Sequence, residues 1–399
     1  MTTPIATEEQ DVTPPLREAG KANSSGVMST GFRNEARRWL EANVPSGPAP
    51  EDGPASRDYV LAWQRAQARG GWAGIAWPKD VGGRGLSVLE QIVWFEEYAR
   101  AGAPSPLNAS FVGLNHAGPT LIACGTPEQK AYHLPRILAG EVIWCQGFSE
   151  PGAGSDLASL KTRGRVEGDE LVIEGHKTWS SFADVADWQE LLIRTHPEGR
   201  TSEALSWVIC PMNAKGITVR PIRTMAGPRK YCEVFYDSVR VPLANVVGGL
   251  GKGWATAMST LSFERGTASL ALLIGLILKV EKLLAACPAD RPEMLMRLAR
   301  LRAEGASIRA TTYRFALDSE NAVPDASGSI IRLSFAEFAQ RVTAAAIDLY
   351  GIDAPEVVGM QGWGHDYLDA FSETIAGGTA EIQRNIIAER VLGLPKGPR

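Results

Sequence analysis

The pattern of apolar and polar positions divides the chain into three blocks. From about residue 31 to residue 140, apolar residues recur three or four positions apart, as Phe32, Ala36 and Leu40 do, and this spacing predicts amphipathic helices. Between residues 143 and 247, short apolar runs alternate with turn residues, which predicts a small all-β domain. Helical spacing then returns and continues almost to the end of the chain. The predicted order is therefore helical, then β, then helical.

Individual elements follow from local signals. Residues 127–138 predict a helix entered through Thr126, because threonine caps helix starts and proline is favoured in the first turn. Residues 77–85, WPKDVGGRG, are punctuated by Pro and Gly and are expected to form a loop. Five runs are expected to be strands: residues 171–175, 190–194, 205–210, 217–222 and 233–241.

The same pattern sets the expected domain boundaries. Residues 1–28 lack an apolar stretch long enough for a signal peptide, so we expect a loose tail there. An N-terminal helical domain is expected over residues 29–142, a middle β domain over 143–247 and a C-terminal helical domain over 248–399.

The most hydrophobic stretch lies between Arg265 and Lys279 and holds thirteen uncharged residues. A helix needs about 20 apolar residues to span a bilayer. The stretch therefore predicts a buried core helix and no membrane span. The pattern favours one long helix that also contains residues 261–265, LSFER.

Charge and cysteine content narrow the function classes. The formal net charge is −4 and 22% of residues are charged, so the chain lacks the basic footprint of a nucleic-acid-binding protein. The five cysteines and five histidines show no metal-ligand spacing. These features favour a reduced, cytoplasmic protein without a metal site.

Two segments in the β block carry candidate chemistry. In residues 149–162, SEPGAGSDLASLKT, small residues would let a ligand approach the backbone and leave amides free to donate, although an ordinary glycine-rich turn has the same composition. In residues 176–181, HKTWSS, an indole stands beside two hydroxyl groups. This arrangement could pack against a flat cofactor and hydrogen-bond to it. The alternative is a core tryptophan followed by two surface serines.

Two further segments lie in the C-terminal block. Glu264, in LSFER, directly precedes the apolar stretch, where desolvation would raise its pKa toward the range useful for a base; the alternative is a solvated, ion-paired glutamate. In residues 376–385, AGGTAEIQRN, two glycines precede Thr379 in the manner of a helix N-cap. Such a cap either attracts anionic groups or is purely structural.

Taken in order, these segments resemble the acyl-CoA dehydrogenase family over nearly all of residues 30–399. The matching motifs are WPKDVGGRG, GTPEQKAYHLPRILAGE, CQGFSEPGAGSD, HKTWSS, EVFYDSVRVP and GGTAEIQRNIIAERVLG. The resemblance implies an α-helical N-terminal domain, a middle β-barrel or sandwich domain and a C-terminal four-helix bundle. It also implies FAD as cofactor, an acyl-CoA substrate and an electron-transfer flavoprotein as electron acceptor.

The resemblance also implies roles for individual residues. Many relatives carry the catalytic base before the Gly-Thr pair, where this chain has Gly377. A smaller branch, which includes isovaleryl-CoA dehydrogenase, carries it in a Leu-x-x-Glu-Arg context, so the base maps to Glu264. The positions expected to bind FAD are Gln146, Phe148, Ser149, Trp179, Ser181, Gly378, Thr379 and Glu381. Those expected near the substrate are Ser155, Arg265 and Gly377.

Two departures from the family pattern affect assembly. The chain lacks the Arg-x-x-Phe-Gly segment whose arginine binds FAD phosphates in relatives, and it has YGIDAP where a Gly-Gly is common. Both features resemble actinobacterial dehydrogenases of steroid side-chain thioesters, some built from two different subunits. Arg309, Arg314 or a partner would supply the missing cation, in a homo-oligomer or a hetero-oligomer. The alternatives are a flavin oxidase or monooxygenase on the same fold, or a non-catalytic subunit.

Overall fold

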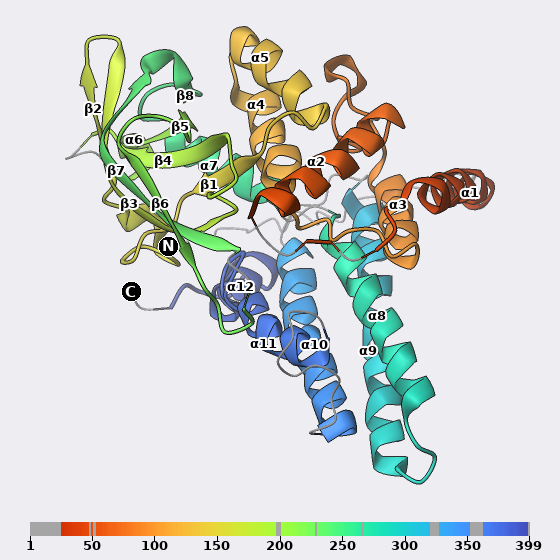
Figure 1. Cartoon of the computed structure of the whole chain (residues 1–399). Helices are drawn as coiled ribbons and strands as arrows, with labels where there is room; N and C mark the ends of the chain where they lie inside the picture. Colours follow the sequence, from red (N-terminus) through yellow and green to blue (C-terminus); the bar gives the residue numbers. More distant parts are fainter. Residues whose placement is uncertain are drawn as a thin grey trace, which may run out of the picture.

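The computed structural model describes residues 25–47, 49–50, 53–196, 201–227, 230–264, 267–319, 327–351 and 362–397. Its elements follow the predicted order of helices, strands and helices (Figure 1). Among the described residues, no helix is long and apolar enough to cross a membrane.

The first block is helical, as predicted. Its elements are α1 (Ser25–Asn43), α2 (Gly53–Arg69), α3 (Val88–Arg100), α4 (Gly118–Cys124) and α5 (Pro127–Leu138), with a π-helical turn η2 (Gly113–Ala117) before α4. Helix α5 has the predicted bounds and the predicted cap: Gln129 N donates to the Thr126 hydroxyl, and the Gln129 side chain accepts from Thr126 N. Residues 77–85 form a loop with one 3-10 turn, η1 (Lys79–Val81).

Helix α1 begins at Ser25, inside the segment 1–28 that we expected to be a tail. Residues 1–24 of that segment lie outside the described residues.

The middle block forms an eight-stranded sheet. Its strands are β1 (Trp144–Gly147), β2 (Arg163–Glu167), β3 (Glu170–Ser181), β4 (Trp188–Arg194), β5 (Leu205–Pro211), β6 (Ile217–Ile222), β7 (Tyr231–Pro242) and β8 (Val246–Val247). The order is β6-β7-β3-β2-β4-β5-β8, and β1 pairs in parallel with β4. All five predicted strands are confirmed. In β7, Cys232, Val234 and Tyr236 alternate into the core, as the period of a half-buried strand requires.

The third block packs helices against both other blocks. It contains α7 (Gly253–Glu264), α8 (Ser269–Ala286), α9 (Pro292–Ser319), α10 (Ser327–Tyr350), α11 (Trp363–Glu373) and α12 (Ala380–Ile386). Helices α8 to α11 form the bundle, in which α10 contacts the other three (Figure 1). Apolar residues of α8, α9 and α10 share one core with α1 and α3.

The expectation of one long helix through LSFER is wrong. Helix α7 ends at Glu264, Thr267 and Ala268 lie in a turn, and α8 begins at Ser269. Threonine is a weak helix former, and the Thr267 hydroxyl donates to Gln91 Oε1 on α3 at 2.8 Å. This tertiary contact anchors the turn between the two helices.

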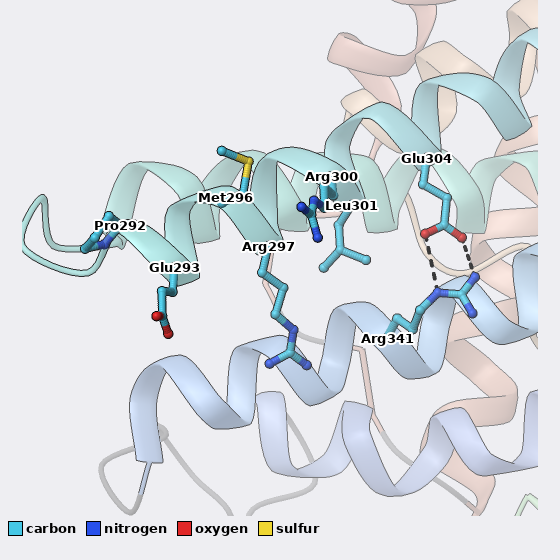
Figure 2. Close-up of a pocket in the computed structure, with 8 residues that line it drawn as sticks. All are labelled: Pro292, Glu293, Met296, Arg297, Arg300, Leu301, Glu304 and Arg341. Atoms are coloured by element: carbon cyan, nitrogen blue, oxygen red, sulfur yellow. Dashed lines mark hydrogen bonds and ion pairs between the residues drawn. The ribbon is translucent and has the colours of Figure 1, made fainter.

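A groove of about 670 Å³ lies on α9, opposite part of α10 (Figure 2). Its lining includes Met296 and Arg300 of α9, and Arg341 of α10, which donates to both carboxylate oxygens of Glu304. None of the residues expected to bind FAD or substrate lines this groove. It is therefore separate from the predicted site.

Two buried carboxylates on α3 hold the N-terminal helices on the bundle. Glu96 and Glu97 are 0% and 2% exposed. Arg33 of α1 donates to both carboxylates, at 2.9 and 2.6 Å, and Arg37 donates to Glu97 at 2.8 Å. Arg309 of α9 donates to Glu96 at 2.5 Å. Burial by itself would raise the pKa of Glu96, but hydrogen bonds and charge from Arg309 and Arg33 outweigh burial and lower it.

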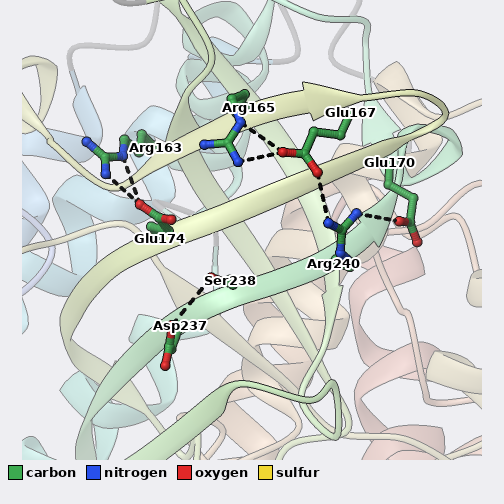
Figure 3. Close-up of polar contacts among 8 residues, drawn as sticks. All are labelled: Arg163, Arg165, Glu167, Glu170, Glu174, Asp237, Ser238 and Arg240. Atoms are coloured by element: carbon green, nitrogen blue, oxygen red, sulfur yellow. Dashed lines mark hydrogen bonds and ion pairs between the residues drawn. The ribbon is translucent and has the colours of Figure 1, made fainter.

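A second set of ion pairs lies on the surface of the sheet (Figure 3). Arg165 of β2 pairs with Glu167, and Arg240 of β7 pairs with both Glu167 and Glu170. These side chains are exposed, and exposed pairs contribute little because water and salt screen them. They provide a natural control for the buried network.

We predict that Glu96→Gln destabilises the fold by about 2 kcal/mol at pH 7, because two arginines lose a buried anionic partner. Glu167→Gln should leave stability unchanged. The pKa of Glu96 is lower in the folded state than in the unfolded state. The stabilisation from ionised Glu96 is therefore complete above the unfolded-state pKa, and it is lost as the pH falls through the folded-state pKa. Urea unfolding midpoints from pH 7 to pH 3 measure both effects. Equal midpoints for the two variants at pH 7 would refute the assignment.

Candidate functional site

Two of the predicted flavin-facing segments lie side by side. The carbonyl oxygen of Ser149 accepts from the amide of Thr178 at 2.9 Å. The carbonyl oxygen of Phe148 accepts from Lys177 Nζ at 3.0 Å. One backbone hydrogen bond and one from the Lys177 side chain thus join the residues after β1 to the second half of β3.

A buried ion pair organises this junction. The Lys177 side chain is fully buried, and its Nζ lies 2.8 Å from Glu150 Oε1. Glu150 also accepts from the amides of Lys161 and Thr162 at 2.6 and 2.8 Å. The carboxylate therefore closes the loop over residues 150–162, which presents Ser155 to solvent.

Burial shifts the pKa of both partners. It lowers the pKa of Lys177 to about 8, against the opposing charge of Glu150. Burial would raise the pKa of Glu150, but the charge and hydrogen bond of Lys177 and the hydrogen bonds from Thr162 and Lys161 outweigh it and lower the value. Near neutral pH both groups are ionised.

Trp179 is held outward by a strained backbone. Its φ is +60°, a conformation that non-glycine residues rarely adopt, and Phe182 shares it at +59°. The pairing of β3 with β7 shifts register between Lys177 and Ser180, as in a β-bulge. The indole is 57% exposed and meets the ring of Tyr231 edge-on at 5.9 Å. A strained, outward-facing indole with half-buried Ser181 beside it fits a flat cofactor.

The Gly-Gly-Thr segment forms a braced turn before α12. The predicted cap is confirmed, because the Thr379 hydroxyl accepts from Ile382 N at 3.2 Å. Gly377 and Gly378 have φ values of +63° and +88°, which glycine adopts at little cost. The Gln383 amide donates to the carbonyl of Gly377 at 2.8 Å. Glu381 lies exposed in the first turn, where hydrogen bonds from its own amide and from Thr379 lower its pKa.

The end of the sheet at which β6 ends and β7 begins lies near α11 (Figure 1). Burial would lower the pKa of Lys230, but Tyr231 and the carboxylates of Asp369 and Glu373 outweigh burial and raise it, so the start of β7 faces α11. Arg332 of α10 pairs with Glu373 and donates to the carbonyl of Ala376 at 3.0 Å, next to the glycine turn. Contacts through Glu373 and Arg332 therefore link the start of β7 to the residue before the glycine turn.

The predicted base stands at the end of α7. Glu264 is the last residue of that helix; its side chain and all of Arg265 lie outside the described residues. One turn earlier, Leu261 packs against the core cluster that contains Phe148. The Thr260 and Thr120 hydroxyl groups lie 2.8 Å apart. The end of α7 is therefore anchored on the core that contains Phe148, in the segment predicted to face the flavin.

Comparison with known protein families assigns the chain. Three family models match it: the N-terminal domain of acyl-CoA dehydrogenases over residues 29–141, the middle domain over 145–239 and the C-terminal domain over 251–392. The chain belongs to the acyl-CoA dehydrogenase family.

Its individual relatives include acyl-CoA dehydrogenases of Mycobacterium tuberculosis. It is 38% identical to acyl-CoA dehydrogenase IpdE1 of Mycobacterium tuberculosis, over 92% of this chain and 97% of the relative. Among solved structures it resembles the Tcur3481-Tcur3483 steroid acyl-CoA dehydrogenase, with a TM-score of 0.82 and 32% identity over 93% and 98% of the two chains. It also resembles the ChsE4-ChsE5 complex of M. tuberculosis, with a TM-score of 0.78 and 30% identity over 95% and 100%.

Two polar groups of this family member escaped the sequence analysis. Lys177 and Glu190 are charged residues that occupy fully buried strand positions. Glu190 Oε1 accepts from Gln146 Nε2 at 2.8 Å and lies 3.1 Å from His116 Nδ1. A charge inside an otherwise apolar strand pattern was the available signal.

No metal centre is evident in the part of the chain that the structure describes. No three His, Cys, Asp or Glu side chains there are grouped so that they could hold an ion. All five cysteines are free, and Cys145, Cys210 and Cys232 are buried, which raises the pKa of each thiol. Buried thiols of this kind act as small apolar side chains.

We predict that Lys177→Met destabilises the fold by about 3 kcal/mol, because Glu150 remains buried without its cation. The pKa of Glu150 in the folded variant should then rise above its unfolded-state value. The stability of the variant would be highest below the unfolded-state pKa of Glu150 and would fall as the pH rises through the folded-state pKa. The defect should therefore grow from pH 5 to pH 7.5.

The control is Lys161→Met, which removes an exposed ammonium group from the same loop and should have little effect. Thermal unfolding at pH 5 and pH 7.5 makes the comparison. A defect that is independent of pH would contradict the role given to the ion pair.

Proposed function

We propose that this acyl-CoA dehydrogenase converts an acyl-CoA thioester to the trans-2-enoyl-CoA with FAD as cofactor and Glu264 as base. The observation that carries the proposal is Trp179. A strained, outward-facing indole beside Ser149 and Ser181 suits the flat ring of a flavin, in a chain that matches the family's three domain models between residues 29 and 392.

The residues of the chain would bind and orient the cofactor. Phe148, Ser149, Trp179 and Ser181 are proposed to hold the flavin ring, and Gly378, Thr379 and Glu381 the phosphate or adenine side. FAD supplies the hydride acceptor when it is bound, and an electron-transfer flavoprotein would reoxidise it.

Proton removal needs both a base and stabilisation of negative charge on the thioester oxygen. A free carboxylate is too weak a base for the α-proton unless fixed donors stabilise that oxygen. Gly377 has no side chain to act as a base, but its backbone amide can donate. We therefore propose Glu264 as base, Gly377 N as donor, and Ser155 and Arg265 as substrate contacts.

Relatives suggest the class of acyl group. One of the similar solved structures is named a steroid acyl-CoA dehydrogenase. We propose a steroid-derived thioester as the substrate class. An anaerobic panel of thioesters from short-chain acyl to steroid, scored by flavin bleaching, tests it; faster bleaching by short linear thioesters would contradict it.

We predict that Glu264→Gln slows anaerobic flavin reduction at least about a thousandfold while FAD still binds, because the amide keeps the shape but cannot take a proton. Stopped-flow absorbance measures the rate. Glu281→Gln on α8, which removes an exposed partner of Arg302, is the matched control and should reduce flavin normally. A Glu264→Gln rate within about threefold of wild type would exclude Glu264 as base.

Assembly is the second part of the proposal. We propose an oligomer in which each FAD site is completed by another subunit, either a second copy or a related chain. Arg309, one of the arginines that could have replaced the missing phosphate ligand, instead pairs with buried Glu96 and lies over the ring of Tyr313. Two similar solved structures are described as pairs of chains.

Exposed apolar side chains support an interface near the glycine turn. Ile375, Leu392 and Leu394 are 67%, 65% and 52% exposed. Large apolar side chains clustered in one part of the sequence are commonly covered by a partner.

We predict that the purified chain forms an assembly larger than a monomer when it is loaded with FAD. Native mass spectrometry with the FAD-to-protein ratio is the measurement. A fully active monomer with one tightly bound FAD would contradict the proposal. An active, yellow homo-oligomer would instead remove the need for a second chain.

A further inference from the structure

The side chain of Gln146 contacts a buried polar cluster formed by Glu190 and His116. Glu190 of β4 is 0% exposed and His116 of η2 is 4% exposed. Gln146 of β1 is half-buried, and its register partner on β4 is Glu190, so both side chains emerge on the same face of the sheet. Burying a carboxyl group is costly unless it is hydrogen-bonded, and Gln146 and His116 are the partners that Glu190 has here.

The polar cluster lies on the same face of the sheet as the proposed site. Trp144 and Phe148, two positions before and after Gln146, belong to the core cluster that also contains Ala257 of α7. Gln146 therefore lies on the same face of the sheet as Trp144 and Phe148, and Phe148 belongs to the segment proposed to face the flavin. Helix α7, which ends at Glu264, contributes Ala257 and Leu261 to the packing of this cluster.

One oxygen atom fixes the orientation of both neighbours. Glu190 Oε1 receives Gln146 Nε2 at 2.8 Å and lies 3.1 Å from His116 Nδ1. His116 Nδ1 also lies 3.3 Å from Gln146 Nε2, so the three polar groups contact one another, and the tautomer of His116 sets which of its contacts it donates to. The amide of Gln146 turns its NH2 group inward.

The backbone around His116 supports a positioning role. His116 lies in the π-helical turn η2, and π-helical turns occur frequently at functional sites because the extra residue redirects side chains. Phe111 packs edge-on against the imidazole at 5.0 Å. The ring is thereby held against Glu190.

We propose that the His116–Glu190 pair is a positioning unit that locks the Gln146 amide with its carbonyl oxygen toward the flavin. This inference rests on the proposed function. The oxidised flavin ring carries a single N–H group, at N3, and its other polar atoms are acceptors. A carbonyl oxygen at this position recognises N3–H, whereas an NH2 group would recognise the ring's carbonyl oxygens or nitrogens.

The test is the ionisation of N3–H in the FAD-loaded protein, followed by visible absorbance against pH. In Gln146→Leu, loss of the acceptor should lower the pKa of bound N3–H by about one unit. Gln67→Leu, a half-buried glutamine on α2, is the matched control and should leave that pKa unchanged. An increase in Gln146→Leu would show that the NH2 group faces the flavin, and no change would remove Gln146 from the ring. Either result overturns the inference.

A double-mutant cycle separates positioning from charge. Glu190→Gln should lower the pKa of N3–H when Gln146 is present and have much less effect in the Gln146→Leu background, because its action passes through the Gln146 amide. An equal effect in both backgrounds would mean that Glu190 acts only through its charge, which overturns the positioning role.

A second measurement avoids alkaline pH. Wild-type protein should bind FAD about fivefold more tightly than 3-methyl-FAD, and Gln146→Leu should lose most of that preference. Equal preference in wild type and variant overturns the inference. If FAD binds but none of these effects appears, the inference fails while the proposed function stands. A protein that binds no FAD in any assembly overturns both.

Discussion

The buried ion pair between Lys177 and Glu150 is the contact on which the arrangement of the site depends. An ammonium group and a carboxylate without access to water must satisfy each other and every remaining donor or acceptor. Lys177 therefore also binds the carbonyl of Phe148, and Glu150 also binds the amides at the far end of its loop. One pair thus joins the end of β1, the second half of β3 and the loop that carries Ser155.

The strain at Trp179 follows from that anchoring. Lys177 is fixed inward, and the register between β3 and β7 is recovered at Ser180, so the residues between them must absorb the irregularity. A positive φ at Trp179 is the result. The backbone cost, of order 1–3 kcal/mol, is tolerated because the buried pair holds the strand on one side and the ladder with β7 holds it on the other. The indole is therefore directed by the fold before any ligand arrives.

The sequence predicted those features whose cause is local. The bounds of α5 follow from Thr126 and Pro127, and the strands follow from two-residue alternation that a single face of a sheet imposes. It did not predict the end of α7, since the turn at Thr267 depends on Gln91, which is remote in the chain. Nor did it predict the burial of Lys177 or Glu190, because a charge in a strand is normally solvated and only the three-dimensional partner shows otherwise.

Buried charge serves a common purpose at three places in this molecule. Glu96 joins α1 and α9 to α3, Glu150 joins a loop to β3, and Glu190 joins β1 and η2 to β4. Each carboxyl group connects elements that are distant in sequence, and each does so with a direction that apolar packing cannot impose. Apolar cores determine which faces meet, whereas these contacts determine how a particular side chain is turned. The pairing of Arg309 with Glu96 illustrates the consequence, because this contact fixes how the Arg309 side chain of α9 is turned toward α3.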